Sequence, residues 1–317
     1  MKIVVVGMIK NSADVIETFV RANGLWADEF MLIDNISSDN TNEIIAKLIE
    51  EGYHIELFKD EEHAYFQSTK MNDLIKKVAM RADVDWIVPL DDDEVLVPQS
   101  EEIRVRTVFN ELDKRNLYYA RWRIYIPTEE DDKDEVCVQR RLGVALADSM
   151  VSTTKCFFSR SLALDDSFKI VQGNHDAYAN YVKRLQLENI RIAHFPVRSA
   201  QQIAAKALVG WTNYLATPNV EAGNGLQWKH IYDFFKNNSD IPIEAMWQMC
   251  LMYADPDKTD HIRVEYVPLN LPDEAFSLKY TTANEVNAIR LYMDNVETLA
   301  ASYAKMLGEK MDTNEKI

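Results

Sequence analysis

Four consecutive acidic residues, Asp91 to Glu94, directly follow the apolar segment 86–90. Neighbouring carboxylates repel one another strongly unless a cation neutralises them. Two carboxylates separated by one residue suit Mg²⁺ or Mn²⁺, which take oxygen ligands and also contact substrate phosphates. The run therefore predicts a metal site that involves Asp91 and Asp93. Its structural alternative is an acidic turn or a helix N-terminus.

Two other kinds of acidic site do not match this run. An EF-hand is excluded, because its calcium-binding loop needs a glycine and a glutamate at fixed positions where this sequence lacks them. A phosphatase-type Asp-x-Asp is disfavoured, because its nucleophile would be expected after the first strand, by analogy between folds.

A second polar cluster, Asp34 to Thr41, follows the apolar segment 30–33. Short polar side chains at such a place can cap the next helix and hydrogen-bond the ring or ribose of a ligand. Capping needs only one of them, so the number of polar residues favours contact with a ligand. Lys10 and Asn11 follow the first apolar segment and are expected on the same edge. Gly7 is a lone glycine and not a glycine-rich fingerprint, which disfavours a dinucleotide cofactor and a P-loop.

The first ninety residues alternate apolar, β-branched segments with segments of helical periodicity. Repeated strand–helix units with short connections predict an α/β fold with a mostly parallel sheet and right-handed crossovers. The expected strands are 2–8, 30–33, 55–58, 86–90, 118–126, 155–159 and 190–195, and the expected helices are 12–23, a segment that contains 44–49, 67–81 and 100–114.

The pattern becomes mostly helical from Ser199 onward. We therefore expect two parts, a mixed α/β core over residues 1–198 and a helical C-terminal region over residues 199–317. Residues 219–225 are expected to form a loop inside the second part. The periodic stretches of this part are 199–216, 227–237, 242–254 and 283–309.

The composition is that of an ordinary globular enzyme, and its charge excludes some partners. The 317 residues include 51 acidic and 35 basic side chains, a formal net charge of −16. This balance argues against nucleic acid or an anionic membrane surface as the main partner. The three cysteines are too far apart for a disulfide framework or a zinc site, and they fit a reducing compartment. Residues 1–8 resemble a strand more than a signal peptide, and no stretch approaches the ~20 apolar residues of a membrane span. A cytoplasmic location is expected.

Three motifs, in their order and spacing, resemble those of one protein family. They are Met8-Ile9-Lys10-Asn11, the segment 33–41 and the segment 86–94. Together they are similar to family 2 glycosyltransferases of the GT-A fold, and most of all to a bacterial subgroup with the motifs D-N-x-S-x-D-x-T and L-D-x-D-E. The resemblance covers about residues 1–215 and implies a GT-A fold with a nucleotide-sugar donor.

The resemblance also implies roles for individual residues near the donor. Asp91 and Asp93 would be the DxD motif, which holds Mn²⁺ or Mg²⁺ on the diphosphate. The expected donor contacts are Lys10, Asn11, Asp34, Asn35, Ser38, Asp39, Lys70, Asp92 and Lys206.

Several later residues have a structural alternative beside the implied role. His194, at the end of a late strand, would complete the metal shell, and an imidazole ligand suits Mn²⁺ better than Mg²⁺. Its alternative is a hydrogen-bonded histidine of the core. Lys206 could neutralise a diphosphate or be a surface lysine, and Lys70 could contact the donor or lie on a solvated helix face.

Inverting glycosyl transfer needs a base that deprotonates the acceptor hydroxyl. The segment Gly173-Asn174-His175-Asp176 occupies the place where the family carries its base, so Asp176 is the first candidate and His175 the second. A His-Asp pair replaces the usual Glu-Asp pair, and His175 could instead bind the acceptor or the metal. Aromatic residues that could stack on acceptor sugars, or belong to the core, are Trp122, Tyr125, Trp211 and Tyr214.

The sequence thus predicts a metal-dependent, inverting glycosyltransferase. The donor would be a nucleoside-diphosphate sugar, with a UDP-sugar favoured. The acceptor would be a hydroxyl of a glycan or lipid-linked glycan, in the synthesis of a bacterial surface glycan such as capsule or lipopolysaccharide. The alternatives are a sugar-1-phosphate nucleotidyltransferase and a catalytically inactive nucleotide-sugar-binding module. Peripheral membrane contact through the helical region and a homodimer are further open possibilities.

Overall fold

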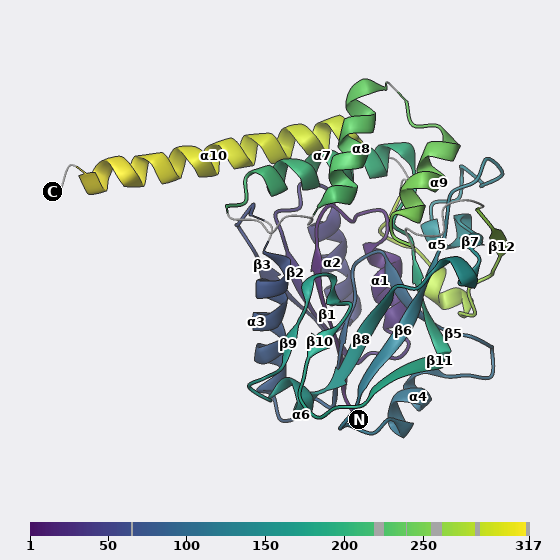
Figure 1. The fold of residues 1–317 in the computed structure, drawn as a ribbon. Coiled ribbons are helices and arrows are strands. Elements are labelled where there is room, and N and C mark those ends of the chain that lie inside the picture. The colour runs from purple at the N-terminus through teal and green to yellow at the C-terminus, as the bar shows by residue number, and fades with distance from the viewer. Residues whose placement is uncertain (65, 219–224, 239, 255–261, 283–285, 315–317) are drawn as a thin grey trace.

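The computed structural model describes residues 1–64, 66–218, 225–238, 240–254, 262–282 and 286–314. Within these residues, eight strands form one mixed sheet in the order β3-β2-β1-β4-β8-β6-β11-β5 (Figure 1). Two small pairs, β9 with β10 and β7 with β12, lie outside it. The strands are β1 (Ile3–Ile9), β2 (Glu29–Asp34), β3 (Ile55–Lys59), β4 (Trp86–Pro89), β5 (Glu94–Pro98), β6 (Leu117–Ile124), β7 (Val144–Leu146), β8 (Thr154–Ser159), β9 (Lys169–Ile170), β10 (Ala177–Tyr178), β11 (Arg184–His194) and β12 (Val264–Tyr266).

Helices cover both faces of this sheet and its upper end in Figure 1. The α-helices are α1 (Ile16–Asn23), α2 (Thr41–Glu51), α3 (Gln67–Ala79), α4 (Val105–Glu111), α5 (Val138–Arg141), α6 (Arg160–Ala163), α7 (Ala200–Leu215), α8 (Leu226–Asn237), α9 (Ile243–Leu251) and α10 (Ala288–Asn314), and the 3₁₀ helices are η1 (Asp148–Met150), η2 (Gln172–Asn174) and η3 (Asp273–Phe276).

Strand β1 is buried on both faces, which explains its continuous run of β-branched residues. Ile3 and Val5 belong to the apolar cluster that contains the buried side chains of α1 and α2. Val4 and Val6 belong to the cluster on the other face, with the buried side chains of α3. Because successive side chains of a strand point to opposite faces, one short apolar segment is enough to join both helical layers to the sheet.

The predicted α/β architecture, a mixed and mostly parallel sheet flanked by helices, is confirmed. Strands β3, β2, β1 and β4 pair in parallel, and so do β6 and β11. Strands β8 and β5 pair antiparallel with their neighbours. The sequence patterns did not predict β5, which begins at the last acidic residue of the run, Glu94.

The C-terminal region lies over the end of the sheet opposite the entry of the chain into β1 (Figure 1). It also returns to the core, because buried Glu17 of α1 accepts backbone N–H bonds from residues 279, 280 and 281. The predicted loop 219–225 falls, except for Gly225, outside the described residues. No helix in the described part of the chain combines the length and the apolar character that crossing a membrane requires.

Candidate active site

A cavity of about 450 Å³ lies beyond the carboxyl ends of β1 and β4, roofed by the C-terminal helices. Strand β1 pairs with β2 on one side and with β4 on the other. The carboxyl end of β1 is therefore a topological switch point of the sheet. Ligands of open α/β sheets bind at such points. The predicted site residues that line the cavity are Lys10, Asn11, Asn35, Asp91, Asp92, Asp93, His175, His194 and Lys206.

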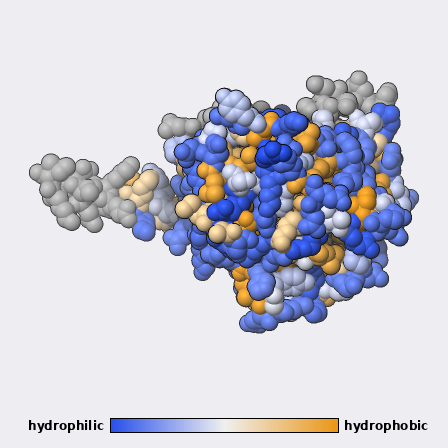
Figure 2. Space-filling model, turned by 90° about the horizontal axis from the view of Figure 1, so that it is seen from below, coloured by the Kyte–Doolittle hydropathy of each residue, from blue (hydrophilic) through white to orange (hydrophobic). Residues whose placement is uncertain are grey.

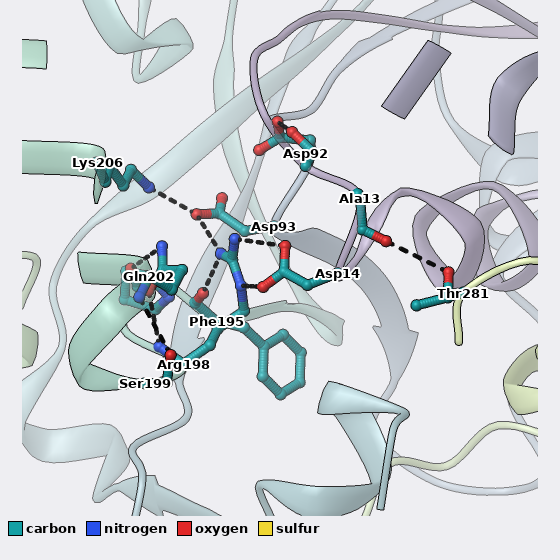
Figure 3. A network of polar contacts seen from close by, with 12 residues as sticks. Ala13, Asp14, Asp92, Asp93, Phe195, Arg198, Ser199, Gln202, Lys206 and Thr281 are labelled. Atoms are coloured by element: carbon teal, nitrogen blue, oxygen red, sulfur yellow. Dashed lines mark hydrogen bonds and ion pairs between the residues drawn. The ribbon is translucent and has the colours of Figure 1, made fainter. Parts of the chain in front are cut away.

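Asp93 is the centre of an ion cluster at the bottom of this cavity (Figure 3). Lys206 Nζ lies 2.8 Å from Asp93 Oδ2, and Arg198 Nη1 lies 3.6 Å from the same oxygen. Burial disfavours the charged carboxylate, but Lys206, His194 and Arg198 outweigh burial and hold the pKa of Asp93 well below its ordinary value. Asp93 is therefore an anion whose position is fixed by two cations.

Arg198 connects this cluster to the loop after β1. Its guanidinium binds Asp14 through two hydrogen bonds, Nε to Oδ2 at 2.6 Å and Nη2 to Oδ1 at 3.0 Å. Nη1 also donates to the carbonyl of Phe195 at 3.1 Å. Such a planar fork keeps one orientation, so Arg198 fixes the two loops that bear Asp14 and Asp93 relative to each other.

Asp93 and His194 are the predicted metal ligands that lie next to each other. His194 Nε2 lies 3.4 Å from Asp93 Oδ1. Burial lowers the pKa of His194 and outweighs the charge of Asp93, which would raise it. The imidazole is therefore neutral, as a metal ligand must be. Two ligands that each stand about 2.1 Å from Mg²⁺ or Mn²⁺ in an octahedral shell lie about 3 Å apart. The observed spacing of 3.4 Å is close to that value, so the two residues could hold one cation.

Asp91 does not join this pair as expected. Its Oδ2 accepts from Lys155 Nζ at 2.5 Å, and the same ammonium lies 2.9 Å from Glu94 Oε2. Lys155 is fully buried, yet Asp91 and Glu94 outweigh the burial and raise its pKa. Among the described residues, no group of three His, Cys, Asp or Glu side chains converges on one metal position. The expected set of Asp91, Asp93 and His194 does not converge on one position among these residues, because Asp91 is paired with Lys155.

The Lys155 pairing leads to a prediction about stability. Lys155→Met should lower the free energy of unfolding by about 3 kcal/mol, because it leaves the fully buried Glu94 and the partly buried Asp91 without their cation. Lys229→Met is the control, since Lys229 forms a half-exposed pair with Asp233 one helical turn away, and its loss should cost about 0.5 kcal/mol. Urea unfolding followed by circular dichroism measures both. Equal effects would contradict a structural role for the buried pair.

His175 lines the cavity with one ring nitrogen held by the backbone. Its Nδ1 lies 2.8 Å from the carbonyl oxygen of Thr154, which can only accept a hydrogen bond. Nδ1 therefore carries the proton, and Nε2 keeps a free lone pair. Burial, followed by the charge of Lys155, lowers the pKa of His175, which favours the neutral ring. Trp122 lies between the two histidines, with its ring centroid 5.1 Å from that of His175 and 4.1 Å from that of His194.

Asp176, the first candidate for the base, is not brought to the cavity. Its half-exposed carboxylate forms an ion pair with Arg184 and accepts a hydrogen bond from Tyr119 Oη at 2.5 Å. It is absent from the cavity lining, whereas its neighbour His175 is part of it. Consecutive side chains point in different directions here, so His175 reaches the cavity and Asp176 does not.

Gly173 has no side chain, and the His175 ring occupies the space where a Cβ would lie. Its φ is +74°, and a Cβ built on it would lie 2.6 Å from His175 Nε2. Gly173→Ala should therefore displace the ring and lower kcat by about 10- to 100-fold. Gly52→Ala is the matched control, because Gly52 also has a positive φ, +111°, but a Cβ there would meet nothing within 4 Å. Both variants should lose about 1–2 kcal/mol of stability, and only the first should lose turnover. Equal turnover in the two would contradict this role of Gly173.

Four residues predicted to contact the donor have local structural contacts instead. Asp34 accepts hydrogen bonds from the backbone of Ser37 and the side chain of Asn42, and Asp39 accepts from the N–H of Thr41 at the start of α2. Neither they nor Ser38 and Lys70 line the cavity, and Lys70 forms an ion pair with Asp60 at 2.5 Å. By contrast, Lys10 reaches the carbonyl oxygens of Asn35 and Ile36 beside the cavity.

Comparisons with known proteins find similarity in solved structures only. No protein-family model and no curated protein matches the sequence. The UDP complex of TarS 1–349 from S. aureus is 12% identical, with a TM-score of 0.39, and the match covers 74% of this chain and 71% of that one. The mannosyltransferase PcManGT from Pyrobaculum calidifontis, in complex with GDP-Man and Mn²⁺, is 12% identical, with a TM-score of 0.40 and coverages of 96% and 75%. A 4-diphosphocytidyl-2C-methyl-D-erythritol synthase is 9% identical, with a TM-score of 0.35 and coverages of 60% and 90%. At these identities and TM-scores we carry no substrate and no residue role over to this chain.

Some residues of the cavity were not predicted from the sequence. His63 lines it from the loop after β3, and Trp228 of α8 lines it from the roof. The Trp228 ring lies so close to α7 that a Cβ on Gly210 would stand 2.8 Å from it. The aromatic pair expected at the acceptor, Trp211 and Tyr214, stack on each other and do not belong to the lining. A glycine that faces a tryptophan across the gap between two helices leaves no local sequence signal.

Proposed function

We propose that this protein is a glycosyltransferase that moves a sugar from a nucleoside diphosphate, with UDP favoured, to a hydroxyl acceptor. One observation carries the proposal. A single cavity at the switch point of the sheet contains a neutral imidazole with a free Nε2, His175, and a carboxylate–imidazole pair, Asp93 and His194, beside the cation Lys206. These are the groups that deprotonation of an acceptor and departure of a diphosphate require.

The polar half of the cavity would bind the donor diphosphate. When bound, Mn²⁺ or Mg²⁺ would supply positive charge to the departing diphosphate. Asp93 and His194 would hold that ion, and Lys206 would add a second positive charge next to it. Asn11 and Asn35, on the loops after β1 and β2, line the same cavity and would contact the nucleoside. Arg198 keeps Asp93 in place from below.

His175 is the proposed base. The acceptor oxygen forms a bond to the anomeric carbon while the bond from that carbon to the diphosphate oxygen breaks. The acceptor proton passes to Nε2 of His175, while the Nδ1–H of the same ring still donates to the carbonyl oxygen of Thr154. Attack on the face opposite the diphosphate inverts the anomeric configuration.

The acceptor would enter from the roof of the cavity. Val209, Trp228, Met252 and Leu291 make this half largely apolar and come from four different segments of the C-terminal region. A glycan or lipid-linked glycan presents ring faces or chains that suit such a surface. We accordingly propose a cytoplasmic enzyme of bacterial surface glycan synthesis that contacts membranes, if at all, only peripherally.

Nucleotide binding tests the proposal first. UDP, GDP, CDP and dTDP are each added to the protein with Mn²⁺ or with EDTA, and melting is followed by thermal shift. Stabilisation by one nucleotide in Mn²⁺ is expected. No response to any of them would overturn the proposal. Release of pyrophosphate from UTP and a sugar 1-phosphate would indicate the nucleotidyltransferase instead.

A further inference from the structure

Helix α10 (Ala288–Asn314) begins against the body of the protein and then projects away from it (Figure 1). One face of its first turns packs on α7, where Ala288, Leu291 and Asn295 are buried. Asn295 Nδ2 donates to Asn213 Oδ1 of α7 at 2.9 Å. This face attaches the helix to its own chain and leaves the other side of the helix available.

A second apolar face runs along α10, and it is exposed. Its large side chains are between 37% and 58% exposed, and Figure 2 shows hydrophobic side chains on the projecting helix. The spacing of its members alternates strictly between four and three residues. Such a 3.5-residue period is the pattern of a coiled-coil seam, which meets a second helix along its whole length. The members of this seam are Ile289, Met293, Val296, Ala300, Tyr303 and Leu307.

The charges on the helix favour a helical partner over a lipid surface. Between residues 288 and 307 the basic residues Arg290 and Lys305 balance the acidic residues Asp294 and Glu297. Helices that bind anionic membranes are rich in lysine and arginine on their polar face, and this one is not. The balance also means that residues 288–307 of two copies would not repel each other, although each chain carries a net charge of −16.

The projecting part of α10 needs a partner for stability. Most helical stability in proteins comes from the packing of an apolar face, and the projecting part of α10 has no such packing within the described part of its own chain. We propose that a second copy of this chain covers the seam, so that two α10 helices pack seam against seam about a two-fold axis. The same patch then contacts itself, which is the usual form of a homodimer interface.

Oligomeric state tests this proposal without reference to catalysis. Sedimentation equilibrium of the full chain is measured at concentrations from about 1 to about 100 μM. It should give twice the chain mass of 36.6 kDa. The double variant Tyr303→Glu/Leu307→Glu places two charges in the seam, on the projecting part of the helix. It should weaken dimerisation at least about 100-fold, since like charges would meet in an apolar contact. The matched control Ala301→Glu/Ser302→Glu adds the same charge to exposed positions outside the seam and should remain dimeric.

Three outcomes would overturn the proposal. The first is a wild-type chain that is monomeric at every concentration. The second is equal dimerisation of the seam variant and the control. The third is a monomer that sediments with vesicles of phosphatidylserine and phosphatidylcholine and loses this binding in the seam variant, which would assign the seam to a lipid surface. Unchanged nucleotide binding in the seam variant would show that its fold is intact.

Discussion

Replacement of Asp93 by asparagine should abolish the metal-dependent binding of nucleoside diphosphate. The amide keeps the size of the side chain but carries no charge, so it can neither hold a divalent cation beside His194 nor balance Lys206 and Arg198. Loss of a metal ligand at such a site should weaken nucleotide affinity in Mn²⁺ about 100-fold or more, since even second-sphere changes cost about 10- to 100-fold. Calorimetric titration of UDP in Mn²⁺ and in EDTA measures the effect. The spectrum of free Mn²⁺ in electron paramagnetic resonance gives the affinity for the metal alone.

The control for Asp93→Asn is Asp113→Asn. Asp113 is an exposed aspartate that pairs with Arg115 and does not line the cavity. The Asp113→Asn variant should bind UDP and Mn²⁺ with the affinities of the unmodified protein. If the UDP affinity of Asp93→Asn differed between Mn²⁺ and EDTA as much as that of the unmodified protein, Asp93 would not hold the cation. The proposed pair with His194 would then be wrong.

Replacement of His175 by alanine should lower kcat by about 10²- to 10⁴-fold and leave the affinity for UDP unchanged. The reason is that His175 Nε2 keeps a lone pair when Nδ1 donates to Thr154, while the proposed diphosphate site lies at Asp93 and Lys206. Because burial lowers the pKa of His175, the neutral form is present at pH 7 and is lost only as the pH falls through that lowered value. The acidic limb of kcat should therefore lie below about pH 6.5 and be absent from the variant.

Asp176→Asn is the control for the base. Its carboxylate is occupied by Arg184 and Tyr119 outside the cavity lining, so kcat should change by less than about 3-fold. A loss of turnover in Asp176→Asn, with normal turnover in His175→Ala, would exchange the two roles. A product with retained anomeric configuration would reject the inverting reaction.

The sequence by itself determined the parallel α/β half of the fold and the edge on which the candidate site lies. The β-branched run of β1 and the helical periodicity of α1 to α3 are local patterns, because burial of a strand on two faces and of a helix on one face leaves a regular period. The order of these units then places Lys10, Asn35 and the acidic run on one edge, since parallel strands all end on the same side. For this reason the cavity could be anticipated from motifs that are far apart in the chain.

Only the tertiary structure decided which of these side chains work together. Lys155 binds Asp91 across 64 positions of sequence, through the antiparallel pairing of β4 and β8. No local period encodes such a contact, and a lysine inside a strand pattern gives no sign of its partner. The choice between His175 and Asp176 depends on the positive φ of Gly173 and on the carbonyl of Thr154, which is 21 positions away. Composition and spacing select the residue types, but the direction of each side chain follows from long-range packing. That direction separates His175, which lines the cavity, from the exposed ion pair of Asp176.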